Sequence, residues 1–592
     1  MISSPQMNQE FPTFMVHGKP ARPWLALLAL VFGLFMALLD ATIVTIALPT
    51  IQHSLQTDLS TVSWVLNAYN LGFAVLLVTI GRFADQHGRK RFFLLGMVLF
   101  SLGSLACATA QWLGNITGTS AIGWLIASRA LQAIGAAGLT PVSLAIITAI
   151  FPPQKRGAAI GVWGALAGLA AAVGPVLGGF LVQQLGWGWI FFVNLPFCAI
   201  GLVMVFLFVP ETRALRTSKR VDLLGVITLT IGLCCLMLAM MEGNDWGWVS
   251  VPVLALFGGA LLGAFLFGYV EFLQRKQDPM VDFSLFKTVS FSGANVTMFL
   301  FSVAVQGAFL ILVLYLMNTM GYGQLQAAYA LLPMPLAQMG SAAVLGRMSQ
   351  KVNPYLVGVI GMFGLSVGFV LLCLLPSDAS YPNIAWRMVL LGVSSGMLFQ
   401  SQPGIALAEI PRARLGVGSG VFNTFRQIGF ALGVAVLLSV FVGQIPSDLN
   451  QAHDDVIGMV QHDSRLPAQL RIAIITHLRE TASTDANASN AEGASGNTTS
   501  YYDLTKLSDQ LPPAMPTQTR ASVRTELRLL SIHINTTFQE HIEKAYKASW
   551  WVAASVGLAG MLSALLTLFA SRKSSSIPAH EEQTEEAGVG VI

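Results

Sequence analysis

Charged residues are scarce in this sequence. Only 10% of its 592 residues are Asp, Glu, Lys or Arg, whereas soluble globular proteins contain about 25%. Apolar residues make up 54% of the chain, and long apolar runs recur along its length, so most of it cannot form a water-exposed surface. The composition excludes an ordinary soluble protein and predicts an all-α polytopic membrane protein.

The sequence also lacks the motifs of several functional classes. Its five cysteines all lie in apolar runs and form no CxxC pair or Cys/His cluster, so neither a disulfide framework nor a metal site is predicted. It contains no phosphate-binding loop, nucleotide motif or nucleophile–base arrangement. We therefore expect a protein that is not an enzyme, binds no cofactor and does not use ATP. The net charge of +4 does not indicate nucleic-acid binding, because the basic residues follow membrane topology.

Fourteen apolar runs are long enough to cross a membrane as helices, which takes about 20 residues for about 30 Å of hydrocarbon. The predicted spans are residues 24–46, 63–81, 92–110, 121–148, 158–182, 189–209, 222–241, 250–272, 291–317, 325–345, 354–375, 384–407, 417–442 and 549–570. A smaller bundle, in which some runs are re-entrant or buried core helices, is the alternative.

The distribution of Lys and Arg supports fourteen spans. With a cytoplasmic N-terminus, 21 basic residues fall in the inside segments, none in the six short outside connections, nine in the long outside segment and three within spans. Basic residues collect on the cytoplasmic side of membrane proteins. We therefore expect a multi-pass protein of the cytoplasmic (plasma) membrane with both termini in the cytoplasm.

A repeated segment indicates how the spans are grouped. GRFADQHGRKR (81–91) follows the second span, and the weaker GRMSQK (346–351) follows the tenth. This spacing predicts two related six-helix halves with the seventh and eighth spans inserted between them. The expected division is a tail (1–23), the first half (24–209), the inserted helices and linkers (210–290), the second half (291–443 and 549–570), an outer insertion (444–548) and a second tail (571–592).

The outer insertion has three parts by composition. Residues 446–480 and 519–551 have helical periodicity, and residues 481–500 between them are of low complexity. We therefore predict a helical hairpin outside the membrane, which is a candidate contact for an adaptor protein. Its histidines are scattered rather than placed at metal-ligand spacing.

Proton coupling needs a group that gains and loses a proton inside the membrane, and a buried carboxylate is the usual choice. Asp40 is the only acidic residue well inside a predicted span, because the remaining candidates lie at span ends. Arg129, in the fourth span, lies at a similar depth and is the expected partner. It would adjust the acidity of Asp40 and hold Gln132 or a chain of waters. A purely structural ion pair is the alternative.

Several motifs resemble those of a known family, the fourteen-helix drug:proton antiporters of the major facilitator superfamily (EmrB/QacA type). The resemblance covers residues 24–445 and the last span, with departures at Thr45, Ala133 and Phe197. It rests on LLDATIVTIALP (38–49), SWVLNAYNL (63–71), GRFADQHGRK (81–90), SRALQAIGAAG (128–138), GPVLGG (174–179), WGWIFFVNLP (187–196) and FRQIGFALGVA (425–435).

The resemblance implies a major facilitator fold and proton-coupled export of lipophilic or monocationic drugs by alternating access. The expected partners are these small substrates, protons and membrane lipid, with no nucleic acid, and the monomer is the expected functional unit. An exporter of an endogenous metabolite or lipid is an alternative within transport. A non-transporting receptor or scaffold is the alternative outside it.

Two sets of small and charged residues are candidates for gating. One forms the turn after the second span, and the other places small residues and a helix breaker in the fifth span. The resemblance implies that the second set lies between the two halves; ordinary tight packing is the alternative. The candidates are Gly81, Asp85, Gly88 and Arg89 in the turn, and Gly174, Pro175, Gly178 and Gly179 in the fifth span.

A site for lipophilic compounds needs apolar and aromatic walls with a few polar groups. Each residue that fits this description is also compatible with lipid contact or core packing. The candidates are Phe35, Met36, Asn67, Asn70, Gln306, Phe309, Asn318, Tyr329, Asn423, Phe425 and Gln427.

Overall fold

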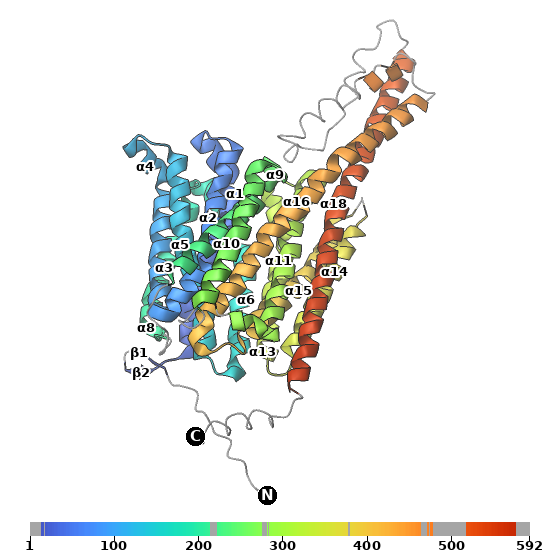
Figure 1. Ribbon diagram of the computed structural model, residues 1–592. Coiled ribbons are helices and arrows are strands. Elements are labelled where there is room, and N and C mark those ends of the chain that lie inside the picture. The colour runs from blue at the N-terminus through green and yellow to red at the C-terminus, as the bar shows by residue number, and fades with distance from the viewer. Residues whose placement is uncertain are drawn as a thin grey trace.

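The computed structural model describes residues 14–16, 18–212, 222–274, 281, 283–376, 379–462, 470–472, 474–476 and 517–575. Nearly all of them lie in helices that run side by side in one bundle (Figure 1). Helix α1 begins and α18 ends at the same end of the bundle, which we call the terminal side. A hairpin formed by α16 and α18 projects from the opposite end, which we call the hairpin side.

The first group of helices forms one half of the bundle. A two-residue antiparallel pair, β1 (Met15–Val16) and β2 (Lys19–Pro20), precedes it. The helices are α1 (Pro23–Leu55), α2 (Leu59–His87), α3 (Arg89–Ala108), α4 (Ala110–Thr117), α5 (Ala121–Ile150), α6 (Pro153–Leu185), α7 (Trp189–Phe192) and α8 (Asn194–Phe208).

The second group forms the other half. It comprises the short helix η1 (Phe283–Lys287), α11 (Val289–Leu314), the π-helical turn η2 (Tyr315–Thr319), α12 (Gln324–Leu331), α13 (Pro333–Met348), α14 (Pro354–Cys373), α15 (Tyr381–Leu407), η3 (Arg412–Arg414), α16 (Leu415–His462) and α18 (Thr517–Ser575). The two groups meet mainly where α6 packs against α13 and α15, and where α2 packs against α16.

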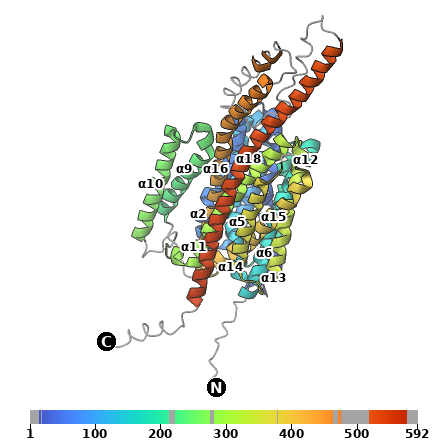
Figure 2. The same ribbon diagram turned by 90° about the vertical axis from the view of Figure 1, so that its right-hand side faces the viewer.

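Two helices stand apart from both groups. Helices α9 (Leu223–Trp246) and α10 (Val251–Gln274) form a pair at the side of the bundle (Figure 2). Helix α9 contacts α2 and α16, whereas α10 packs mainly on α9. Large apolar side chains of α10, such as Leu261 and Phe265, are therefore exposed, as expected for a helix that faces lipid.

The number of spans agrees with the prediction of fourteen. Thirteen helices among the described residues are long and apolar enough to cross a membrane. Helix α15 adds a further helix of 27 residues within the bundle. Its sequence contains Arg387 and several Ser and Gln residues, which lower its hydropathy although it occupies the position expected of the twelfth span.

The hairpin differs from the prediction in how it is connected. Its two long arms continue the helices of the bundle, because α16 runs without interruption for 48 residues and α18 for 59 residues. At 1.5 Å per residue these helices are about 72 and 88 Å long, well beyond the 30 Å of hydrocarbon. Their projecting arms share a separate apolar core, which includes Val456, Leu527 and Phe538. The low-complexity stretch 481–500 and the tail after Ser575 lie outside the described residues.

Close packing of α3 against α5 positions the polar residues described next. A Cβ atom on Gly96 would lie 2.8 Å from the Gly135 carbonyl oxygen, and one on Gly103 would lie 2.7 Å from the Gln132 backbone. The two helices therefore touch backbone to backbone. This contact places Ser104, the neighbour of Gly103, beside Gln132.

Candidate functional site: a sealed carboxylate cluster

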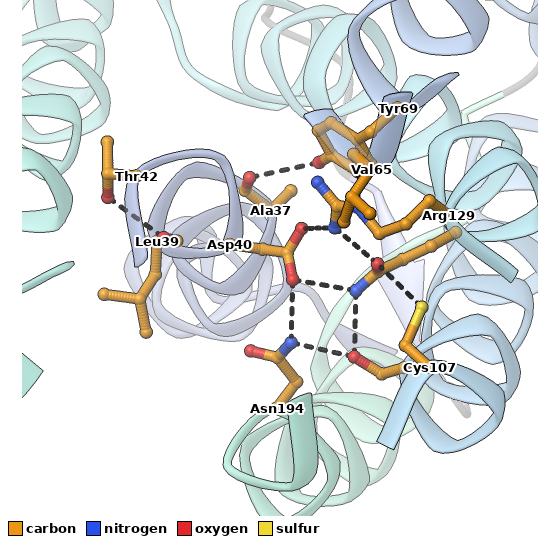
Figure 3. Close-up of polar contacts among 11 residues, drawn as sticks. Ala37, Leu39, Asp40, Thr42, Val65, Tyr69, Cys107, Arg129 and Asn194 are labelled. Atoms are coloured by element: carbon orange, nitrogen blue, oxygen red, sulfur yellow. Dashed lines mark hydrogen bonds and ion pairs between the residues drawn. The ribbon is translucent and has the colours of Figure 1, made fainter. Parts of the chain in front are cut away.

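Asp40 lies at the centre of a polar cluster inside the first group of helices. Its side chain is completely buried, and it points from α1 toward residues contributed by α2, α3, α5 and α8 (Figure 3). The residues of the cluster, Asp40, Ser104, Arg129, Gln132 and Asn194, are each 0% exposed, so solvent does not reach the carboxylate in this conformation. The sequence prediction that Asp40, Arg129 and Gln132 lie together agrees with this arrangement.

Three donors surround the Asp40 carboxylate. The Arg129 Nη1 atom donates to Oδ2 at 2.5 Å, and the Gln132 Nε2 atom donates to Oδ1 at 2.9 Å. The Asn194 Nδ2 atom donates to the same Oδ1 at 3.1 Å. The carboxylate therefore accepts one charge-assisted hydrogen bond from a guanidinium and two hydrogen bonds from side-chain amides.

Arg129 is held by more than its ion pair. Its Nε atom donates to the Val65 carbonyl oxygen at 2.9 Å, and its Nη1 atom also donates to Gln132 Oε1 at 2.7 Å. The guanidinium carbon lies 4.1 Å from the centre of the Tyr69 ring, which adds a cation–π contact. Removing one partner of such a buried pair costs about 3–5 kcal/mol, because the other charge is left uncompensated.

Ser104 connects the two amides of the cluster. Its Oγ atom accepts from Gln132 Nε2 at 2.9 Å and from Asn194 Nδ2 at 2.8 Å. Sequence reasoning did not assign Ser104 or Asn194 to the site. Asn194 could have been considered, since it is a polar residue within the WGWIFFVNLP motif.

The Asp40 carboxylate is enclosed by protein in this conformation. Protonation of Asp40 would weaken its pairing with Arg129, and deprotonation would restore it. Neither exchange can take place while the carboxylate is sealed from water. Any proton transfer at Asp40 therefore requires the surrounding helices to move.

The turn between α2 and α3 ties the two halves together on the terminal side. The Asp85 carboxylate accepts hydrogen bonds from the backbone amides of Gly416 and Val417, both at 3.0 Å. These amides lie at the start of α16, where helix N–H groups lack partners of their own and favour a negative charge. Arg89 donates to Asp85 at 2.8 Å and to the Arg412 carbonyl oxygen at 2.6 Å.

Two glycines of this turn are required by their surroundings. A Cβ atom on Gly81 would lie 2.4 Å from the Gly416 carbonyl oxygen, so α2 and α16 touch there. Gly88 has a φ of +119°, and a Cβ atom on it would lie 2.7 Å from the Glu211 carboxylate. Of the predicted gating residues, Gly81, Asp85 and Arg89 therefore contact the start of α16 or the residues just before it, whereas Gly88 lies against Glu211.

The glycines of α6 pack differently from the expectation. Cβ atoms on Gly174 and Gly178 would meet Thr42 and Ile43 of α1, so this part of α6 packs inside the first half and not between the halves. Pro175 lies inside the helix, and Gly179 is buried. The contact with the second half uses an earlier part of α6, where Gly161 lies against Gly346. The sequence predicted how deep these glycines lie in the span, but it did not predict which face of α6 they occupy.

The candidate substrate residues are spread over several environments. Asn67 and Asn423 are bonded to protein groups, and Met36 is completely buried in the core. Phe35, Phe309, Asn318, Phe425 and Gln427 are partly buried, whereas Asn70, Gln306 and Tyr329 are exposed. A cavity of about 630 Å³ between α6, α13, α14 and α15 is lined by other residues, including Ile160, Gln400 and Ser401.

Glu242 and Arg426 are among the buried charged residues that received no role from the sequence. Glu242 is 7% exposed, and its Oε1 atom accepts from Asn67 Nδ2 at 3.5 Å. The predicted span ended at residue 241, one position before it, whereas α9 continues to Trp246. Arg426 is 4% exposed and lies between aromatic rings of α6 and α15.

Comparisons with known proteins identify the family. The sequence profile of the Major Facilitator Superfamily matches residues 30–434. The multidrug resistance protein Stp of Mycobacterium tuberculosis (strain CDC 1551 / Oshkosh) is 34% identical over 72% of this chain and 77% of its own length. The tetracenomycin C resistance and export protein of Streptomyces glaucescens is 31% identical, over 71% of this chain and 76% of its own. The methylenomycin A resistance protein of Streptomyces coelicolor (strain ATCC BAA-471 / A3(2) / M145) is 33% identical, over 69% and 84%.

Solved structures share the fold at low sequence identity. The crystal structure of the human organic anion transporter MFSD10 (TETRAN) aligns with a TM-score of 0.53 and 17% identity, over 71% of this chain and 94% of that one. The proton:xylose symporter XylE aligns with a TM-score of 0.50 and 14% identity, over 70% and 88%. The resemblance inferred from the sequence motifs is therefore confirmed, and the chain belongs to the major facilitator superfamily of membrane transporters.

Proposed function

We propose that this protein is a proton-coupled antiporter that exports lipophilic, drug-like compounds across the cytoplasmic membrane by alternating access. The observation that carries the proposal is the sealed cluster at Asp40, a fully buried carboxylate with three donors. Burying a charged side chain at this depth in the membrane costs free energy, so its presence indicates a functional role. Resistance and export functions in the names of the relatives favour a toxic or drug-like substrate.

The proposed orientation places the terminal side in the cytoplasm. Arg89, Lys155, Arg347 and Lys351 all lie at that end of the helices that carry them, in agreement with the positive-inside rule. The proposed units are residues 24–209 and 291–443 with 549–570, separated by the inserted pair α9–α10. The monomer is the proposed working unit, and the hairpin is the proposed contact for any adaptor protein.

In the proposed cycle the two halves rock about their interface. The Asp85 contact with α16 would hold the cytoplasmic side closed, and its rupture would let substrate enter from the cytoplasm. Proton uptake by Asp40 from outside and its release inside would drive the return. A membrane potential of about 100 mV makes each inward elementary charge worth about 2.3 kcal/mol, enough for roughly fifty-fold accumulation.

The direct test is export by the purified protein in liposomes. A lipophilic fluorescent dye is loaded on the side that corresponds to the cytoplasm, and a pH gradient of either direction is imposed. We expect uphill dye movement only when protons flow in the opposite direction, together with measurable proton flux. No gradient-dependent movement of a panel of lipophilic dyes, with correctly inserted protein, would refute drug export. In that case, proton flux driven by lipid or metabolite extracts would favour the endogenous exporter, and its absence would favour the receptor or scaffold.

A further inference from the structure

Arg426 is a buried cation for which the described part of the chain supplies no anion. It lies on α16 about 16 Å from the first residue of that helix at 1.5 Å per residue, near the middle of the bundle. Its Nε atom is buried without a hydrogen-bond partner. No ion pair or hydrogen bond joins its guanidinium to any other residue in the described part of the chain.

Aromatic rings from two helices cover this guanidinium. Its central carbon lies 5.8 Å from the ring of Trp163 on α6 and 5.8 Å from the ring of Phe399 on α15. These distances are close to the limit of about 6 Å for a cation–π contact, so the rings offset only part of the missing hydration. Arg426 thus differs from Arg129, which has an ion pair and three hydrogen-bond acceptors.

The site lies at the interface between the two halves. Trp163 belongs to the first half, whereas Phe399 and Arg426 belong to the second. Gly164, the neighbour of Trp163, packs directly on the Phe399 backbone, where a Cβ atom would lie 3.0 Å from the carbonyl oxygen. Separation of α6 from α15 would therefore uncover Arg426.

The 630 Å³ cavity on the terminal side is lined by residues that neighbour this aromatic cover along α6 and α15, although the two rings themselves do not line it. Ile160, which lines it, is one helical turn from Trp163, and Gln400, which also lines it, follows Phe399. A compound in this cavity would reach Arg426 only after Trp163 and Phe399 separate, because neither ring nor Arg426 lines the cavity. Asn423, one turn before Arg426 on α16, adds a buried carbonyl oxygen without a donor, which suits the protonated form of an acid or an adjacent hydroxyl group.

We propose that Arg426 is an anion-binding subsite for substrates, and that amphipathic aromatic acids are among the compounds this protein exports. The guanidinium pairs with a carboxylate or an ionised phenol, and Trp163 and Phe399 stack on the aromatic part of the same molecule. This inference rests on the proposed export function and extends its substrate range, because the sequence led us to expect only neutral and monocationic compounds.

Equilibrium binding tests the subsite without any proton gradient. The probes are 1-pyrenebutyrate and its neutral amide, which share the aromatic group and differ in charge. Binding to the purified full-length protein is followed by energy transfer from tryptophan to pyrene. We expect the wild-type protein to bind the acid at least about tenfold more tightly than the amide, as a charge-assisted hydrogen bond allows. Equal or weaker binding of the acid overturns the proposal even if no variant folds.

Two substitutions then assign the preference to Arg426. Arg426→Gln should reduce the ratio of the two affinities to about one, and Arg426→Lys should retain part of it, because the charge remains without the planar fork. An unchanged ratio in Arg426→Gln overturns the assignment. If chloride displaces the acid completely and binds about tenfold more tightly than the acid does, Arg426 is a site for inorganic anions. That result also overturns the proposal. If the ratio behaves as expected and lipophilic dyes are exported under a pH gradient but 1-pyrenebutyrate is not, the claim that aromatic acids are exported is overturned. If no dye is exported either, the anion-binding subsite stands and the proposed export function fails.

Discussion

Loss of the Asp85 carboxylate should open the terminal side of the transporter. Asp85→Asn keeps the size of the side chain but removes its charge, and its single oxygen cannot serve both amides of α16 and Arg89 as the carboxylate does. Losing about one charge-assisted hydrogen bond, together with the favourable charge at a helix N-terminus, weakens the closed state by about 2 kcal/mol. Since each 1.4 kcal/mol is tenfold, the closed population should fall about thirty-fold relative to the open one.

Distances across the interface report this shift. Lys155 on α6 and Lys351 after α13 are exposed on opposite sides of the interface, next to a hydrogen bond of 2.7 Å from Gln350 Nε2 to the Gln154 carbonyl oxygen. Spin labels at Lys155→Cys and Lys351→Cys, in a protein whose five native cysteines are replaced, give the distance distribution by pulsed electron resonance. We expect a short distance to dominate without the substitution and a longer one to appear in Asp85→Asn.

The matched control is Asp58→Asn on the same helix. Asp58 caps the opposite end of α2, where its side chain accepts from the Thr61 amide. Because Asn caps a helix about as well as Asp, this substitution removes a carboxylate at the other end of α2 without changing the distance on the terminal side. A distribution in Asp85→Asn that matches both the control and the unsubstituted protein would refute the role of Asp85 in closing this side.

Three further changes test other parts of the account. Arg129→Ala should reduce uphill efflux more than Arg129→Lys, because a remaining cation still stabilises the Asp40 carboxylate; equal losses would favour a geometric role over a charge role. Glu242→Gln should keep uphill efflux within about twofold when Asp40 carries the coupled proton, and loss of coupling in this variant would move that role to α9. Replacement of residues 451–540 by a short flexible linker should leave membrane insertion and thermal unfolding of the bundle unchanged, since the hairpin arms have a separate core; an unfolded bundle would show that the hairpin is an integral structural element.

Much of the fold was readable from composition alone. A bilayer forces every backbone group into internal hydrogen bonds, so an apolar run of about 20 residues has few alternatives to a helix. The same constraint made Asp40 and Arg129 conspicuous, because charges inside spans are rare. Adding helix direction and depth was sufficient to predict that these two residues meet.

Contacts that depend on helix rotation were not predictable. Asn194 bonds Asp40, and Ser104 bonds Gln132 and Asn194, only because α8 and α3 turn those faces toward the cluster. No apolar pattern encodes that choice when all sides of a helix are hydrophobic. The same reason explains why Gly174 and Gly178 pack on α1 and not between the halves. Glu242 was missed because hydropathy locates the end of a span only to within a few residues.

The central claim is that Asp40 carries the coupled proton. The measurement that tests it most directly compares two transport modes of Asp40→Asn in liposomes: uphill efflux driven by a pH gradient, and exchange of labelled for unlabelled substrate without a gradient. Asn has nearly the same volume as Asp but cannot cycle a proton. We predict that uphill efflux is abolished while exchange continues, and that Asp40→Glu retains partial uphill activity. Uphill efflux by Asp40→Asn at the rate of the unsubstituted protein would contradict the account.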